Sequence, residues 1–166
     1  MRLGGARSML TSMTSSTASA ADQPVSRPTG LHHVRLSVSD IERSRTFYSH
    51  LLGADPAIDN TSELTDPTAV DDPQRLYGGV VFEVGDQILG LRPVPGAAGE
   101  TFTPSRVGLD HVSLAVSSRA DLEAAAARMS AAGVEHGEII ELSEQNMQIL
   151  SIQDPDDINL ELTAPL

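Results

Sequence analysis

The chain of 166 residues contains no cysteine. That absence excludes a disulfide framework, a thiolate zinc site, an iron–sulfur cluster and a thiol nucleophile, so only histidine and carboxylate side chains could hold a metal. No apolar run approaches the roughly 18 residues of a membrane span. Positive charge is also scarce, with 11 basic against 23 acidic residues and a net charge of −12. We therefore expect neither nucleic acid nor an anionic membrane as a partner.

The N-terminal residues 1–29 lack the uninterrupted apolar run of a secretory signal. We interpret them as a disordered tail and expect a cytoplasmic protein. Two alternatives stay open. The segment contains arginine and serine and few acids, as organelle transit peptides do, and translation could instead start at Met9 or Met13. The remaining residues, 30–166, have the length of one ordinary domain.

An internal repeat organises the chain after this tail. The eleven residues from Gly30 and the eleven from Gly108 agree at seven positions, with an offset of 78 residues. Both copies alternate apolar and polar side chains, as half-buried strands do. Each copy therefore begins with a strand that carries a histidine, His33 or His111, on the face opposite its apolar side chains.

Each copy continues in the same way, with a helix and then about three short strands. Helical spacing follows at residues 41–52 and 119–132, and each segment ends before a glycine. The predicted short strands span 79–84, 87–92, 138–142, 147–153 and 158–163. We assign the helical residues Phe47 and Tyr48 to the core.

This order predicts an α+β fold made of two βαβββ modules. Module one spans residues 30–92, a connector spans 93–107, and module two spans 108–166. A module of this size has one face of a small sheet to bury, and we expect neither module to be stable alone. We therefore expect the two to form one curved, cupped mixed sheet with the helices outside.

The last predicted strand adds an acid to the two repeated histidines. Residues 158–162 alternate so that Glu161 lies with Asn159 on the face opposite the apolar side chains. Taken singly, a strand histidine or glutamate is more often an ordinary core or surface residue. Together, two histidines and one carboxylate suit Fe(II), Mn(II), Ni(II) or Zn(II) with open coordination positions. We expect His33, His111 and Glu161 to hold one such divalent metal ion.

These residues resemble the vicinal oxygen chelate superfamily of glyoxalases, bleomycin-resistance proteins and ring-cleaving dioxygenases. The resemblance covers residues 30–166 and lies in Leu31-His32-His33-Val34, Ser44-Arg45-Thr46-Phe47-Tyr48, Asp110-His111-Val112 and Asp154-Pro155-Asp156. It implies paired βαβββ modules with metal ligands at His33, His111 and Glu161. Gly90 stands at the fourth ligand position of the glyoxalase I enzymes. The remaining three-ligand set is similar to that of extradiol dioxygenases and fosfomycin-modifying transferases.

Three further side chains are candidates for contact with a substrate. Arg35 lies two residues after His33 on the same strand face, and Arg92 follows Gly90 on the face of that ligand position. Either could bind a carboxylate, enolate or phosphate through paired hydrogen bonds, and an ion pair with an acid is the alternative for each. Asn159 is the third candidate.

We expect a metal-dependent enzyme of the lyase, isomerase or dioxygenase type, acting on a small molecule that chelates the metal through two neighbouring oxygens. Glu161 released from the metal, or a metal-bound hydroxide, would act as base, and Arg35 would assist. The alternatives are a non-catalytic protein that sequesters an antibiotic or metabolite, and a module with a structural ion only. We expect a homodimer, whose modules pair within a chain or swap between chains. In the swapped form, His33 of one chain would meet His111 and Glu161 of the other.

Overall fold

The computed structural model describes residue 26 and residues 28–166. The chain divides into residues 1–31 and a compact unit, His32–Leu166, which carries all of the secondary structure described below. The predicted tail, residues 1–29, falls almost entirely outside the described residues and stays a prediction. Within the described residues, no helix is both long and apolar enough to cross a membrane.

The first half of the compact unit forms four strands and one long helix: β1 (His33–Val38), α1 (Ile41–Leu52), β2 (Ile58–Asp59), β3 (Val80–Val84) and β4 (Gln87–Pro93). Three short 3₁₀ helices separate β2 from β3: Thr61–Thr65, Ala69–Asp71 and Pro73–Gly78. The strands form sheet A in the order β1-β4-β3-β2. Only the β1–β4 pair is parallel, so the sheet is mixed.

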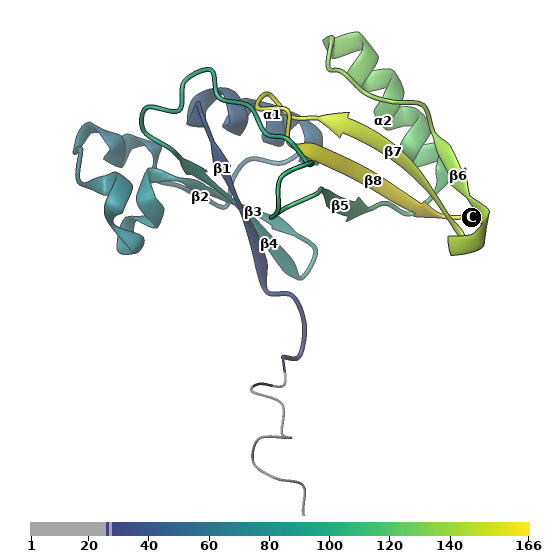
Figure 1. Ribbon diagram of the computed structural model, residues 1–166, viewed down its shortest axis with the longest axis horizontal. Coiled ribbons are helices and arrows are strands. Elements are labelled where there is room, and N and C mark those ends of the chain that lie inside the picture. The colour runs from purple at the N-terminus through teal and green to yellow at the C-terminus, as the bar shows by residue number, and fades with distance from the viewer. Residues whose placement is uncertain (1–25, 27) are drawn as a thin grey trace, which may run out of the picture. The chain divides into compact units, whose positions relative to one another are not determined.

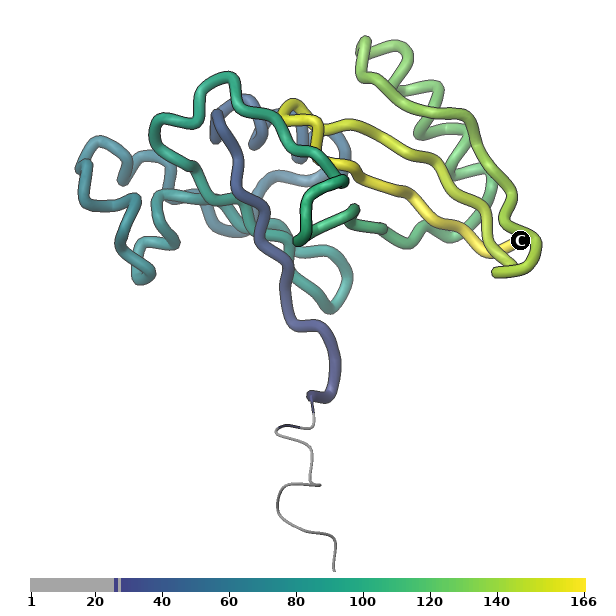
Figure 2. Tube along the Cα trace, viewed as in Figure 1, coloured from purple at the N-terminus to yellow at the C-terminus, as the bar shows by residue number. Residues whose placement is uncertain are grey.

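The second half repeats this plan with β5 (Val112–Ala115), α2 (Arg119–Ala132), β6 (Ile140–Leu142), β7 (Met147–Gln153) and β8 (Asn159–Pro165). A short 3₁₀ helix, Ser143–Gln145, lies between β6 and β7. Sheet B has the order β5-β8-β7-β6, again with one parallel pair, β5–β8. Figure 1 shows the two sheets with their helices, and Figure 2 follows the chain from β4 through the connector to β5. The predicted α+β fold is confirmed.

Local signals explain why both helices begin and end where the sequence predicted. Asp40 caps the N-terminus of α1 by accepting hydrogen bonds from the backbone N–H groups of Glu42 and Arg43. Ser118 caps α2 in the same way. Gly53 and Gly133 then end α1 and α2 in the left-handed conformation, with φ of 66° and 67°.

Each helix covers one face of its own sheet, and the covered faces belong to a single hydrophobic core. In α1 the buried side chains are Ile41, Ser44 and Tyr48, and in α2 they are Leu122, Ala125 and Met129. Neither α1 nor α2 covers the other face of its sheet; on sheet A, the short 3₁₀ helix Pro73–Gly78 reaches this face through Tyr77. We call these the open faces of sheet A and sheet B, and they carry the side chains that the sequence singled out.

The turn between β7 and β8 joins the two halves. Asp154 is buried there and accepts a hydrogen bond of 3.0 Å from the hydroxyl of Tyr48 on α1. Asp156, also buried, accepts from the backbone N–H of Ser39 at 2.8 Å and pairs with Arg43. These two acids therefore have a structural role, which their place in a turn motif of the sequence does not indicate.

Candidate functional site

The open face of sheet A carries His33 and Arg35. Along β1 these side chains and Ser37 are exposed, whereas the intervening Leu36 and Val38 are buried. This alternation is the one predicted from the repeat. His33 Nδ1 lies 3.0 Å from Nδ1 of the neighbouring His32, which leaves its Nε2 without a protein partner among the described residues.

His111 precedes β5 on the open face of sheet B and is oriented by its neighbour. Its Nδ1 lies 2.6 Å from a carboxylate oxygen of Asp110. Because an ionised carboxylate only accepts hydrogen bonds, this contact places the proton on Nδ1 and leaves the lone pair of Nε2 free. Asn159 donates to the backbone carbonyl of Asp110 at 3.5 Å, so it supports the segment that carries His111.

Glu161 stands on the same open face, in β8. Its Oε1 accepts from the hydroxyls of Ser113 at 3.2 Å and Thr163 at 3.0 Å, while its other oxygen has no hydrogen-bond partner among the described residues. Ser113 is the register partner of Glu161 across the β5–β8 pair. The carboxylate is thus held by one oxygen and free at the other, as a metal-binding carboxylate often is.

The three predicted ligands do not meet within one chain. Their chemistry suits a divalent ion, and each has a free donor atom. Yet within residues 28–166 no three histidine, aspartate or glutamate side chains lie close enough together to hold a metal ion. A single copy of this chain therefore contains a partial ligand set on each sheet, His33 on sheet A and His111 with Glu161 on sheet B.

Gly90 occupies the position in sheet A that corresponds to Glu161 in sheet B. Arg35 pairs with Gly90 in the β1–β4 register, just as Ser113 pairs with Glu161 in the β5–β8 register. The side chain of Arg35 lies over this glycine: a Cβ added at Gly90 would sit 3.3 Å from Nε and 3.5 Å from Cγ of Arg35. The absence of a side chain at Gly90 therefore makes room for the positively charged side chain of Arg35.

Tyr77 contacts both candidate arginines, although no motif in the sequence marks it as part of the site. The guanidinium carbon of Arg92 lies 3.8 Å from the centre of the Tyr77 ring, and that of Arg35 lies 5.3 Å from it. Both distances fall in the range of cation–π attraction. The tyrosine is half-buried, and no strand or helix periodicity marks it, since it lies in an irregular turn.

The turn that carries Tyr77 has an unusual backbone. Leu76, Tyr77 and Gly78 follow one another in the left-handed conformation, with φ of 52°, 63° and 69°. A non-glycine residue held there costs on the order of 1–3 kcal/mol, and such strain often occurs at functional sites. Gly79 follows, and a side chain on it would collide with the backbone carbonyl of Leu91. The Gly-Gly pair after Tyr77 is the sequence signal that could have indicated this special turn.

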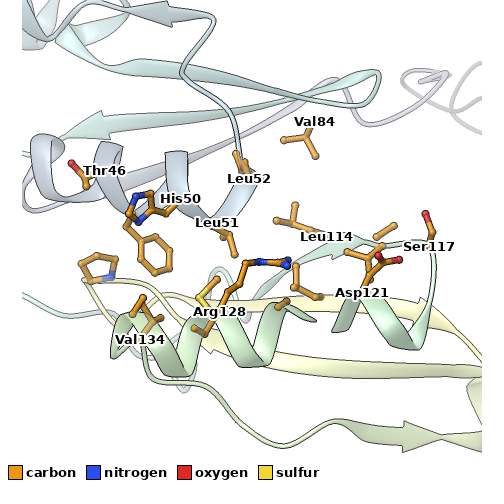
Figure 3. A pocket seen from close by; sticks show the side chains of 18 of the residues that line it. Thr46, His50, Leu51, Leu52, Val84, Leu114, Ser117, Asp121, Arg128 and Val134 are labelled. Atoms are coloured by element: carbon orange, nitrogen blue, oxygen red, sulfur yellow. The ribbon is translucent and has the colours of Figure 1, made fainter. Parts of the chain in front are cut away.

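A groove of about 1000 Å³ lies elsewhere, between α1 and α2. Figure 3 shows Leu51 and Leu52 of α1, Leu114 of β5 and Arg128 of α2 around it. Its lining is mainly apolar, and none of the predicted ligands contributes to it. The groove is thus a separate hollow, with a volume in the range of small-molecule pockets.

Comparisons with known proteins agree with this architecture. A family model described as "Glyoxalase/Bleomycin resistance protein/Dioxygenase superfamily" matches residues 30–162. The crystal structure of a glyoxylase/bleomycin resistance protein/dioxygenase domain from Frankia sp. EAN1pec is similar, with 25% identity, a TM-score of 0.66, and coverage of 84% of this chain and 100% of that one. No curated protein matches the chain by sequence.

Two solved structures with named activities share the fold at lower identity. Lactoylglutathione lyase from Agrobacterium tumefaciens is 17% identical with a TM-score of 0.57, over 84% of this chain and 96% of that one. The fosfomycin resistance protein FosX from Listeria monocytogenes is 16% identical with a TM-score of 0.59, over the same shares. With the repeated module, the open faces and the family match over most of its length, the chain belongs to the glyoxalase/bleomycin resistance protein/dioxygenase superfamily.

Proposed function

We propose that this protein is a metal-dependent enzyme acting on a small molecule with two neighbouring oxygens, and that its site is shared between two chains. His33 of one chain would complete the metal site with His111 and Glu161 of a second. The observation that carries the proposal is the half-site on sheet B, where His111 and Glu161 are each oriented by a neighbour and each keep a free donor atom.

The roles of the protein groups follow from these contacts. Asp110 holds the proton of His111 on Nδ1, so that the lone pair of Nε2 is free to bind a metal ion. Ser113 and Thr163 hold one oxygen of Glu161 and leave the other available for a ligand or a substrate proton. When bound, a divalent ion would supply Lewis-acid stabilisation of an enolate or alkoxide.

The sharing of the site is supported by two further observations. No group of three suitable ligands exists within the described residues of one chain. In addition, β1, which contains His33, and β5, which follows His111, are edge strands. Each has one side unpaired in its sheet. Unpaired edges favour association with another chain, and a twofold dimer would bring two copies of each half-site together.

Elemental analysis tests whether the protein binds a metal ion. The protein is purified without a metal-affinity tag and is then reconstituted with each candidate ion. We expect about one first-row metal per chain in the parent, with loss in His111→Ala and in Glu161→Ala. His50→Ala, which removes an exposed histidine of α1, is the matched control and should keep the metal. Iron would direct assays to oxygen chemistry, whereas nickel, zinc or manganese would direct them to lyase or isomerase chemistry.

Mixing two variants tests whether the site is shared. When His33→Ala and Glu161→Ala chains are refolded together, about half of the dimers should contain one chain of each kind. Each such mixed dimer has one intact site of its two, so the mixture should hold about one quarter of the parent's metal content. A site within one chain would give none. A parent that binds no metal after reconstitution contradicts the metal proposal itself, and a metal-binding parent whose mixture stays empty contradicts only the sharing.

A second function is favoured by the groove between α1 and α2. Its volume of about 1000 Å³ and its mainly apolar lining suit sequestration of a small apolar molecule without chemistry. Absence of metal from the reconstituted parent would make this the leading function. Leu51→Arg, which places a charge in the groove, should then abolish protection by such a ligand against thermal unfolding.

A further inference from the structure

We propose that Arg35, Tyr77 and Arg92 form a subsite for a doubly charged oxyanion, such as a phosphate or phosphonate group, on the open face of sheet A. As a statement about the substrate, this inference rests on the proposed function, because the subsite lies beside His33. The anion subsite itself is tested apart from the metal.

Charge is the first argument. Four other described arginines, Arg43, Arg45, Arg75 and Arg119, each pair with a carboxylate within 4 Å. Within the described part of the chain, four arginines have no such partner, although the protein has 23 acids and a net charge of −12: Arg35, Arg92, Arg106 and Arg128. Among these four, only Arg35 and Arg92 lie over a shared aromatic ring, that of Tyr77. Two guanidinium groups that lie over one ring and lack a counter-ion attract a doubly charged anion more strongly than a singly charged one.

The geometry of the guanidinium groups is the second argument. A guanidinium group carries its five N–H donors in its own plane, so contact of its face with an aromatic ring leaves those donors free. Arg92 uses one of them in a long bond of 3.4 Å to the backbone carbonyl of Val70. Arg35 has no hydrogen-bond acceptor among the described residues. Tyr77 thus holds two cations whose donors are available to a ligand.

The comparison between the two sheets is the third argument. In sheet B the register pair of β5 and β8 is Ser113 with Glu161, a hydroxyl that donates to an acid. In sheet A the same pair is Arg35 with Gly90, and the arginine lies where the acid would stand. The two halves therefore differ in charge at the equivalent place, with a positive group in sheet A and a negative one in sheet B. Such a reversal of charge turns a cation-binding position into an anion-binding one.

The placement also defines the substrate. Arg35 lies two residues from His33 on the same strand face, a separation of roughly 7 Å along the strand. The substrate would therefore carry a phosphate or phosphonate group at one end and its neighbouring oxygens several bonds away, at the metal.

Isothermal titration with inorganic phosphate and with acetate at pH 7.5 tests the subsite, on the full chain as purified and after dialysis against a chelator. We expect phosphate to bind both samples, at least tenfold more tightly than acetate. Arg35→Met and Arg92→Met should each weaken phosphate binding by about tenfold or more, since each removes charge-assisted hydrogen bonds. Arg106→Met removes one charge from the connector and is the matched control, which should bind phosphate as the parent does. Tyr77→Leu should weaken binding severalfold by freeing both arginines.

The outcomes separate this inference from the proposed function. A parent that binds no phosphate, or binds acetate equally well, overturns the subsite whatever its metal content. An effect of Arg106→Met as large as that of Arg35→Met also overturns it, since net charge would then explain the binding. Phosphate binding that depends on Arg35 and Arg92 in a protein that never takes up metal supports the subsite and contradicts only the metal proposal.

Discussion

Replacing Tyr48 with phenylalanine should weaken the contact that joins the two halves of the fold. Tyr48 is fully buried, and its hydroxyl donates to Asp154 at 3.0 Å. Burial, reinforced by the charge of Asp154, raises the pKa of Tyr48 far above its ordinary value, so the phenol stays protonated and able to donate. Phenylalanine keeps the ring and most of the volume. The loss is therefore that of one hydrogen bond to a charged group, about 2 kcal/mol of unfolding free energy.

Truncating Asp154 to alanine should cost more. Its Oδ1 accepts from the backbone N–H groups of Asp156 and Ile158, both at 2.8 Å, and its Oδ2 accepts from Tyr48. The change leaves three donors without an acceptor in a buried region, each at about 1–3 kcal/mol. After partial relaxation we expect a loss of roughly 4 kcal/mol, which is large for one substitution. The double variant with Tyr48→Phe and Asp154→Ala should be little less stable than Asp154→Ala alone, because both changes remove the same hydrogen bond.

Urea unfolding followed by far-ultraviolet circular dichroism measures these differences, because the chain has no tryptophan to report by fluorescence. Tyr77→Phe is the matched control, since the hydroxyl of Tyr77 has no hydrogen-bond partner among the described residues and should contribute less than about 0.5 kcal/mol. A Tyr48→Phe protein as stable as this control would refute the reasoning. So would strict additivity in the double variant, because two groups in contact should couple.

Three further changes test other parts of the structure. Gly79→Ala should lower stability by about 1–3 kcal/mol in urea unfolding, because its Cβ would collide with the carbonyl of Leu91; an unchanged midpoint would contradict the close approach. Leu122→Ala should cost about 2–5 kcal/mol, since Leu122 is fully buried on the core-facing side of α2, and a loss below 1 kcal/mol would indicate a looser core. Asp66 accepts hydrogen bonds from Thr68 and then Arg75, which lower its pKa from 3.8 to about 2. The stability this contributes is present above pH 4 and is lost as the pH falls towards 2, so Asp66→Asn should flatten the stability curve there, and an unchanged slope would contradict the assignment.

Much of the fold could be predicted from local pattern. The helices at residues 41–52 and 119–132 begin and end as predicted, because capping residues and terminal glycines act within one turn. The strand faces of His33 and Glu161 also follow from a period of two residues, which needs no tertiary information. The second strand of the second half, β6, is shorter than predicted, Ile140–Leu142 against residues 138–142, as is common at an edge strand of a sheet.

The candidate site was predictable only in part. The repeat indicated His33 and His111, since matching positions in two copies occupy matching places in two sheets. Tyr77 was missed because it lies in an irregular left-handed turn, where no periodicity relates it to β1 or β4. Asp154 and Asp156 fit a turn motif in the sequence. Their contacts with Tyr48 and Ser39 connect positions more than 100 residues apart, which no local pattern indicates.

The sequence by itself determined the two modules, the side of each strand that faces the core and the residue types available for a metal. These properties depend on interactions between residues close in the chain, so spacing and composition are enough to reveal them. Only the tertiary structure decided which side chains meet. It brought Arg35 over Gly90 and both candidate arginines to Tyr77, and it kept the three predicted ligands of one chain from forming a single group. Such contacts depend on how strands pair and sheets pack, and local periodicity carries no information about that.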